Sequence, residues 1–277
     1  MDGINTRLIA LDLDGTLLDS QKRLSPRNRA ALERAAARGI EIVPTTGRFY
    51  AGMPESVRTL PFLHYIIAIN GAQVTDLTTE KTLYRAEIGW QEAVSLLRYL
   101  DEWGVLYDCY AQGKGWITAE MQDRVDQFVH DPIYLGMILR LRTRVPELKT
   151  FLTETAMDVQ KIQVYPGDPE KRLALLRALP EAFPSLLATS SIAENIEINA
   201  AAASKGQALL ALAAHLGLRQ EQTLAFGDGL NDVTMLRDAG TGVAMANAAE
   251  EIRACADCVT ASCDEDGVAQ YLEQFLL

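Results

Sequence analysis

The chain has 277 residues, of which 48% are hydrophobic and 23% charged, so it can bury a sizeable core in one large domain or two modest ones. A net charge of −11 argues against nonspecific binding to nucleic acid or to an anionic membrane. No stretch approaches the roughly 20 apolar residues of a membrane span, and the N-terminus lacks an apolar signal region, so we expect a cytoplasmic protein.

The first segment predicts strands alternating with a helix. Apolar runs predict strands at 8–13, 40–43 and 65–69, and a helix at 26–38. Ser25 and Pro26 suit the start of that helix, and Gly39 suits its end. Strands that alternate with helices over short connections predict a parallel sheet covered on both faces.

Asp12 and Asp14 stand at the predicted C-terminal end of the first strand, just before Gly15-Thr16. Two carboxylates so close together are costly to bury, because like charges repel and both lose water. A hard divalent cation such as Mg²⁺ would offset that cost, and a carboxylate can also attack phosphorus to form an aspartyl-phosphate. The alternative is a strand end that carries two solvated aspartates.

A second polar cluster, Thr45-Thr46-Gly47-Arg48, follows the second strand. A hydroxyl and a free backbone N–H at the end of a strand can bind a phosphate oxygen, and Gly47 lets the backbone come close. Taken alone, this pattern is also typical of an ordinary strand-to-helix turn.

The middle of the chain shows no comparable motif. Its pattern predicts helices at 90–103 and 169–179, strands at 105–110 and 159–165, and a turn at 113–115. The simplest organisation is a doubly wound core with a second α/β domain inserted into it, the chain crossing near 80–85 and 190–196.

In the last segment, strands and helices alternate again, as in the first. The pattern predicts helices at 204–215, 230–238 and 247–256 and strands at 223–226 and 241–245. Lys205 lies in the first turn of a helix, where a cation opposes the helix dipole unless it faces an anion. Asp228 follows a strand, and Asn231 and Asp232 lie one helical turn further on. A role as helix N-cap would explain Asp228, but it would not explain Asn231 and Asp232.

Three of the four cysteines lie close together near the C-terminus, at Cys255, Cys258 and Cys263. They could be part of a metal or redox site. Since no second cysteine pair and no nearby histidine accompany them, we interpret them as buried thiols near a helix end.

The four polar clusters occupy strand ends or the helix starts just after them, where ligands bind in a parallel α/β sheet. Their order resembles the haloacid dehalogenase superfamily of phosphohydrolases, and within it the Cof-like group. The similar stretches are Asn70 to Ala72, Gly227 to Leu236, Val243 to Ala248 and Asp264 to Val268. Ala246 departs from the pattern, because the group usually has glycine there.

The resemblance implies a Rossmann-like α/β core, formed by 1–83 and 195–277, that carries an inserted C2-type α/β cap at 84–194. In the core, Asp12 matches the nucleophile, and Asp14 matches the acid/base that protonates the leaving oxygen and then activates water. Three carboxylates, Asp12, Asp14 and Asp228, are predicted to hold one Mg²⁺. The resemblance implies that Asp14 contributes its backbone carbonyl to that site.

The resemblance also assigns the residues around the phosphoryl group. Lys205 matches the cation that orients Asp12, while Thr46 and the Gly47 amide match phosphoryl-binding groups. Asn231 matches a phosphate contact, and Asp232 a supporting carboxylate. Arg48 is a further candidate for contact with the phosphate.

The resemblance therefore implies a Mg²⁺-dependent phosphatase of small phosphorylated metabolites, sugar phosphates foremost, with no obligate protein partner evident. A phosphomutase on the same fold and a non-catalytic phosphometabolite-binding protein are the alternatives. A two-component receiver would be about half this length. In the cap, the candidate leaving-group contacts are aromatic and polar residues such as Tyr107, Tyr110, Trp116 and Tyr134.

Overall fold

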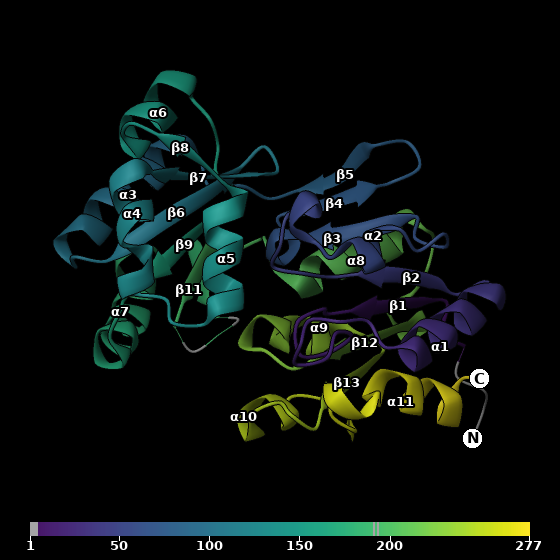
Figure 1. The fold of residues 1–277 in the computed structure, drawn as a ribbon. Coiled ribbons are helices and arrows are strands. Elements are labelled where there is room, and N and C mark those ends of the chain that lie inside the picture. Colours follow the sequence, from purple (N-terminus) through teal and green to yellow (C-terminus); the bar gives the residue numbers. More distant parts are fainter. Residues whose placement is uncertain (1–4, 191, 193) are drawn as a thin grey trace. The chain divides into compact units, whose positions relative to one another are not determined.

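The computed structural model of the protein describes residues 5–190, 192 and 194–277. The chain divides into two compact units, drawn together in Figure 1. The first unit comprises Met1–Arg85 and Ser204–Leu277, and the second comprises Ala86–Ala203. This division differs from the predicted one at the second crossing, because residues 195–203 belong to the inserted unit.

The first unit contains both flanks of the chain. Its strands are β1 (Leu8–Leu11), β2 (Glu41–Pro44), β3 (Tyr65–Ala68), β4 (Gln73–Asp76), β5 (Lys81–Arg85), β12 (Thr223–Gly227), β13 (Thr241–Met245) and β14 (Cys258–Thr260). Its α-helices are α1 (Pro26–Ala37), α2 (Glu55–Arg58), α8 (Lys205–His215), α9 (Val233–Asp238), α10 (Glu250–Arg253) and α11 (Gly267–Phe275). Single 3₁₀ turns are η1 (Tyr50–Gly52), η2 (Ile69–Gly71), η4 (Gln220–Gln222), η5 (Leu230–Asp232) and η6 (Cys263–Glu265).

A parallel five-stranded sheet forms the centre of this unit, in the order β14-β13-β12-β1-β2. The register places Leu11 opposite both Phe226 and Pro44, so three strands end at one edge of the sheet. The backbone N–H of Asp12 continues the ladder by donating to the carbonyl of Phe226 at 3.0 Å. The predicted doubly wound α/β core is thereby confirmed.

Helices cover both faces of the sheet, as the alternating pattern predicts (Figure 1). On one face, side chains of α8 and α9 such as Leu209 and Met235 pack against Leu8 and Ala10 of β1. On the other face, Tyr271 of α11 lies edge-on to Phe226 of β12, with ring centroids 5.3 Å apart. Burial on both faces explains why the strands read as continuous apolar runs.

Three predicted elements of this unit differ in the structure. The third predicted strand, β3, forms a three-stranded antiparallel sheet with β4 and β5, and a single parallel bridge between Thr45 and Ile67 links it to the end of β2. The helix predicted at 230–238 begins as the 3₁₀ turn η5. The helix predicted at 247–256 shrinks to α10, because its N-cap Ala249 is extended, and Asn247 lies before it with its side chain hydrogen-bonded to Gly15 and Cys263.

The second unit is mixed α/β. Its strands are β6 (Leu106–Ala111), β7 (Lys114–Thr118), β8 (Arg142–Val145), β9 (Lys161–Tyr165), β10 (Leu186–Thr189) and β11 (Ile196–Ala200). Its helices are α3 (Trp90–Glu102), α4 (Ala119–Arg124), the 3₁₀ turn η3 (Val125–Gln127), α5 (Pro132–Leu141), α6 (Leu148–Thr155) and α7 (Pro169–Ala182). Helix α7 includes Pro180 in its last turn and ends at Ala182, beyond the predicted end at 179.

A six-stranded sheet, in the order β10-β11-β9-β6-β7-β8, forms the centre of the second unit. Strand β11 pairs with β9 and β10, which is why residues after 195 belong here. One face of the sheet is apolar and is covered by α3, α6 and α7. These helices contribute Leu97, Leu152 and Leu175, respectively, to the shared apolar cluster. Lys114 lies in β7, so the predicted turn at 113–115 is shorter and centres on Gln112 and Gly113.

In the described part of the chain, none of the helices has both the length and the apolar composition that crossing a membrane requires.

Candidate active site

Lys205 joins the two flanks of the chain at the sheet edge. It opens α8, whose N-cap Ser204 accepts a hydrogen bond from the backbone N–H of Gln207. The Lys205 side chain is fully buried, and its Nζ donates to Asp12 Oδ1 and to Asp232 Oδ1, each at 2.6 Å. A buried ammonium between two carboxylates loses much hydration, which those partners replace. Their negative charges outweigh burial and raise the pKa of Lys205.

The start of α8 also depends on Gly71. A Cβ at this position would lie 2.2 Å from the carbonyl oxygen of Ser204, and φ is +92°. Only glycine tolerates both conditions, so the Asn70-Gly71 pair lets the turn after β3 approach the helix that carries Lys205.

Asp228 follows β12 and is held by residues from two separate segments. The hydroxyl of Thr16 donates to Oδ1 at 2.8 Å, and the side-chain amide of Asn247 donates to Oδ2 at 3.2 Å. A Cβ at Gly15, whose φ is +95°, would lie 2.3 Å from the same Oδ2. Asp228 is therefore packed directly against the backbone that follows Asp12.

Asp12, Asp228 and Asp232 each offer a carboxylate oxygen within 4.8 Å of the others. Burial and the nearby Asp232 raise the pKa of Asp12, although Lys205 opposes that shift, and the same two causes raise the pKa of Asp228 to about 7. Lys205 therefore does not offset all the negative charge, and a set of hard oxygen donors with surplus charge fits a cation such as Mg²⁺. Asp232 is already engaged, because its Oδ2 accepts the backbone N–H groups of residues 228 and 229.

The carboxylate of Asp14 is directed elsewhere, so the expectation that its side chain joins this cluster is not met. Arg48 donates to both of its oxygens, Nε to Oδ2 at 2.7 Å and Nη2 to Oδ1 at 2.6 Å. Lys22 adds an ion pair to Oδ1 at 3.1 Å. Burial alone would raise the pKa of Asp14, but these two cations outweigh it and lower the pKa. The cations on Asp14 explain why its side chain leaves the carboxylate cluster.

The other predicted phosphate-binding groups lie in the same unit. Thr46 is buried, and its Oγ1 accepts a hydrogen bond from the backbone N–H of Arg48 at 3.1 Å. The Asn231 amide donates to Asn70 Oδ1 at 3.0 Å, which ties the helix start after β12 to the turn after β3. Gly47 lies between Thr46 and Arg48 at the end of β2.

Sequence reasoning missed three residues that contact the aspartates, Thr16, Lys22 and Asn247. It assigned Arg48 to the phosphate and not to Asp14. Each contact except that of Lys22 joins residues distant in the chain, so no local pattern predicts it. The cysteines are all free, and among the described residues none belongs to a group of potential metal ligands.

The four aromatic candidates of the second unit fall on different sides of its sheet. Tyr107 and Trp116 pack into the apolar cluster under the helices, which makes them core residues. The Tyr110 hydroxyl instead accepts a hydrogen bond from Arg142 at 2.8 Å, and the Tyr134 hydroxyl accepts one from Asn195 at 3.4 Å.

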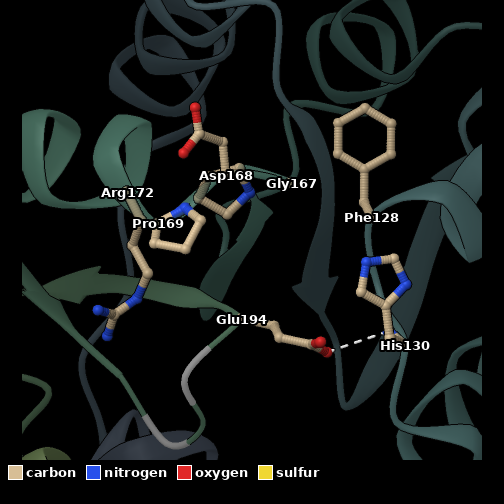
Figure 2. Close-up of a pocket in the computed structure, with 8 residues that line it drawn as sticks. Phe128, His130, Gly167, Asp168, Pro169, Arg172 and Glu194 are labelled. Atoms are coloured by element: carbon tan, nitrogen blue, oxygen red, sulfur yellow. Dashed lines mark hydrogen bonds between the residues drawn. The ribbon is translucent and has the colours of Figure 1, made fainter.

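A separate pocket of about 150 Å³ opens elsewhere in the second unit (Figure 2). The backbone N–H of His130 donates to Glu194 across it at 3.1 Å. Its lining consists of Phe128, His130, Pro166, Gly167, Asp168, Pro169, Arg172 and Glu194. None of the site residues predicted from the sequence lines this pocket.

Comparison with known proteins identifies the class. The haloacid dehalogenase-like hydrolase family matches residues 9–272. Phosphatase YwpJ of Bacillus subtilis is 32% identical, with 98% of this chain and all of the relative covered. A solved haloacid dehalogenase-like hydrolase from B. subtilis superposes with a TM-score of 0.84 at 32% identity, covering 98% of this chain and 100% of that one. A solved sugar phosphatase of subclass IIB of the same superfamily has a TM-score of 0.80 at 25% identity, covering 98% and 99%.

The chain therefore belongs to the haloacid dehalogenase-like hydrolases, and the Cof-like resemblance is confirmed. Within that family it is an enzyme of the phosphatase class.

Proposed function

We propose that the protein is a Mg²⁺-dependent phosphatase of small phosphorylated metabolites, sugar phosphates foremost, that works through an aspartyl-phosphate on Asp12. The observation that carries the proposal is the buried Asp12–Lys205–Asp232 chain beside Asp228. Phosphoryl transfer needs a nucleophile in line with the leaving group, charge neutralisation and a proton donor. The first unit contains groups suited to each of these tasks.

We assign Asp12 the role of nucleophile. Its Oδ1 accepts from Lys205, and among the described residues no hydrogen bond engages Oδ2, which leaves that oxygen for attack on phosphorus. Lys205 fixes the orientation of the carboxylate and favours its ionised form against the effect of burial. An Oδ2–P bond forms while the bond from phosphorus to the leaving oxygen breaks.

We assign Asp14 the role of acid and base. It gives a proton to the leaving oxygen in the first step and takes one from water in the second, when the Asp12 Oδ2–P bond breaks and inorganic phosphate leaves. To carry these protons, the carboxylate of Asp14 must turn away from Arg48. Arg48, Thr46, the Gly47 amide and Asn231 are the groups that we assign to the transferring phosphoryl.

Mg²⁺ would be held by the carboxylates of Asp12 and Asp228 and by the backbone carbonyl of Asp14. When bound, the ion offsets the carboxylate charges and the negative charge of the phosphoryl group. Asp232 supports the site by holding Lys205 and the backbone after β12.

We assign the choice of leaving group to the second unit, as a cap. The groups suited to phosphoryl transfer all lie in the first unit, whereas the second carries none that we assign to the transfer itself. A sugar phosphate is the substrate class favoured by the family likeness and by the sugar phosphatase among the similar structures.

The first prediction tests metal and reaction together. Purified protein incubated with a panel of phosphorylated metabolites should release inorganic phosphate with Mg²⁺, stop in excess chelator and recover when Mg²⁺ is restored. Undiminished hydrolysis in excess chelator would overturn the metal assignment. Isomerisation of a sugar phosphate without phosphate release would indicate a mutase, and binding without turnover would indicate a non-catalytic protein.

A further inference from the structure

The segment between Asp14 and α1 folds into a tight loop. Leu18 bridges to Asp14 on one side and to Leu24 on the other. Asp19 closes the turn, because its Oδ1 accepts the backbone N–H groups of Gln21 at 2.9 Å and of Arg23 at 2.8 Å. The loop is therefore built by local hydrogen bonds, not left to solvent.

Lys22 occupies the tip of this turn in a left-handed conformation, with φ of +61°. Residues with a Cβ adopt that conformation at a cost, so the turn has to hold it. A second anchor comes from outside, since the backbone N–H of Ser20 donates to Asp264 Oδ1 at 2.8 Å. These contacts bring the Lys22 ammonium 3.1 Å from Asp14 Oδ1.

Asp14 is thus shared between two cations with different attachments. Arg48 contacts both carboxylate oxygens, and its Nη1 also donates to the carbonyl of Gly52 at 2.9 Å. Lys22 makes one contact, through an ammonium that can rotate. If Arg48 turns to the substrate phosphate, Asp14 loses two hydrogen bonds at once, and Lys22 is the cation that remains beside it.

We propose that Lys22 is a positioning residue for Asp14, which it keeps at the reaction centre after Arg48 has turned to the phosphoryl group. This inference rests on the proposed function. A single ammonium contact holds one carboxylate oxygen and leaves the other free to carry the proton to the leaving oxygen and later to receive one from water. The alternative is an exposed ion pair that contributes little.

The experiment uses the leaving group to separate the two interpretations. Nitrophenolate leaves readily without a proton, whereas an alkoxide from a sugar phosphate needs one from Asp14. Lys22→Gln, Lys22→Arg and the control Lys81→Gln, an exposed lysine on β5, are compared with wild type in rapid-mixing reactions, first with excess enzyme and then with excess substrate.

In Lys22→Gln we expect the first step to slow about 10- to 100-fold with a sugar phosphate but less than about threefold with p-nitrophenyl phosphate. With the latter, a rapid burst of nitrophenolate should precede slow turnover, because Asp14 also activates water. Lys22→Arg should restore most of the sugar phosphate rate, and Lys81→Gln should match wild type.

Equal losses on both substrates, or no loss on either, would overturn the role of Lys22. Failure of the proposed function itself looks different, because wild-type protein would then release phosphate from neither ester.

Discussion

Asp12 and Asp14 stand two residues apart, yet they meet opposite surroundings. Asp12 is 6% exposed and paired with a buried lysine, while the side chain of Asp14 is 29% exposed and paired with Arg48 and Lys22. The pKa of Asp12 is raised by burial and Asp232, and that of Asp14 is lowered by its two cations. Two carboxylates in different environments suit two different roles.

The two roles predict different losses on substitution. Asp12→Asn should abolish turnover, because an amide cannot form the acyl-phosphate. Asp14→Asn should still transfer the phosphoryl group to Asp12 slowly but stall at hydrolysis, since general acid–base help is typically worth about 10²–10⁴-fold. Acid-quench trapping of the phosphoenzyme, together with phosphate release, measures both. Activity in Asp12→Asn, or a phosphoryl group trapped on another residue, would contradict the assignment.

Lys205 offers a second test at this scale, because the chain contains a matched control. Lys205→Met leaves two buried carboxylates without their partner and should lower the free energy of unfolding by about 3–5 kcal/mol. Lys161 is equally buried and pairs with Glu197 at 2.9 Å in the second unit. Chemical denaturation should show a loss for both variants, but only Lys205→Met should lose turnover of p-nitrophenyl phosphate. Loss of that turnover in Lys161→Met as well would remove the distinction.

Sequence reasoning located the residues of the site that follow strands. Asp12, Thr46 and Asp228 share one sheet edge because parallel strands end together, and this follows from the pattern. The partners of Asp14 and Asp228 could not be found in this way. Lys22 is a single lysine in a polar loop, and Asn247 reaches Asp228 across 19 positions, so neither has a local signal.

Among the elements, α6 has an unusual start. Its N-cap is Glu147, whose carboxylate accepts the backbone N–H groups of Lys149 at 3.1 Å and Thr150 at 2.6 Å. Burial alone would raise the pKa of Glu147, but these hydrogen bonds outweigh it and lower the pKa to about 2. Because the folded pKa lies below the usual 4.5, the cap stabilises the protein above that pH and loses its effect as the pH falls toward 2.

Glu147→Ala should therefore lower the free energy of unfolding by about 1 kcal/mol at pH 7. The difference from wild type should shrink as the pH falls from 4.5 toward 2, where the wild-type carboxylate takes up a proton. Glu154→Ala, an exposed glutamate on the same helix, is the control and should cost less at every pH. Urea denaturation across this pH range measures the effect. A difference that stays constant with pH would show that the cap acts without its charge.

Strands and helices marked by an apolar run or a cap residue in the sequence were predicted correctly. Elements that depend on pairing with residues distant in the chain were not. Strands β1 and β12 are apolar runs bounded by turn residues, and Ser25 caps α1 as predicted by accepting from the backbone N–H of Asn28. The β4–β5 hairpin was missed because its strands are polar and partly exposed. Its stability comes from pairing with β3, which a local pattern does not reveal.

At the scale of the whole molecule, the second unit has a sheet with two dissimilar faces. The face away from α3 and α6 carries buried polar side chains in register, with Asp108 opposite Gln163 and Gln163 opposite Glu197. Both amide atoms of Gln163 are buried, and in the described part of the chain they have no hydrogen-bond partner. A buried amide without partners is costly, so the hydrogen-bonding capacity of Gln163 is unused in this structure.

If the second unit selects the leaving group, changes on this polar face should alter selectivity more than chemistry. Tyr110→Phe and Gln163→Leu keep the approximate side-chain volume and remove polar atoms, so the ratio of kcat/KM between two sugar phosphates should shift by about 10-fold. Activity on p-nitrophenyl phosphate should change much less, because that ester offers no sugar hydroxyls to recognise. Arg177→Gln, at an exposed position on α7, is the control and should leave both unchanged. Parallel losses on every substrate, with thermal unfolding unchanged, would mean that the second unit takes part in phosphoryl transfer itself.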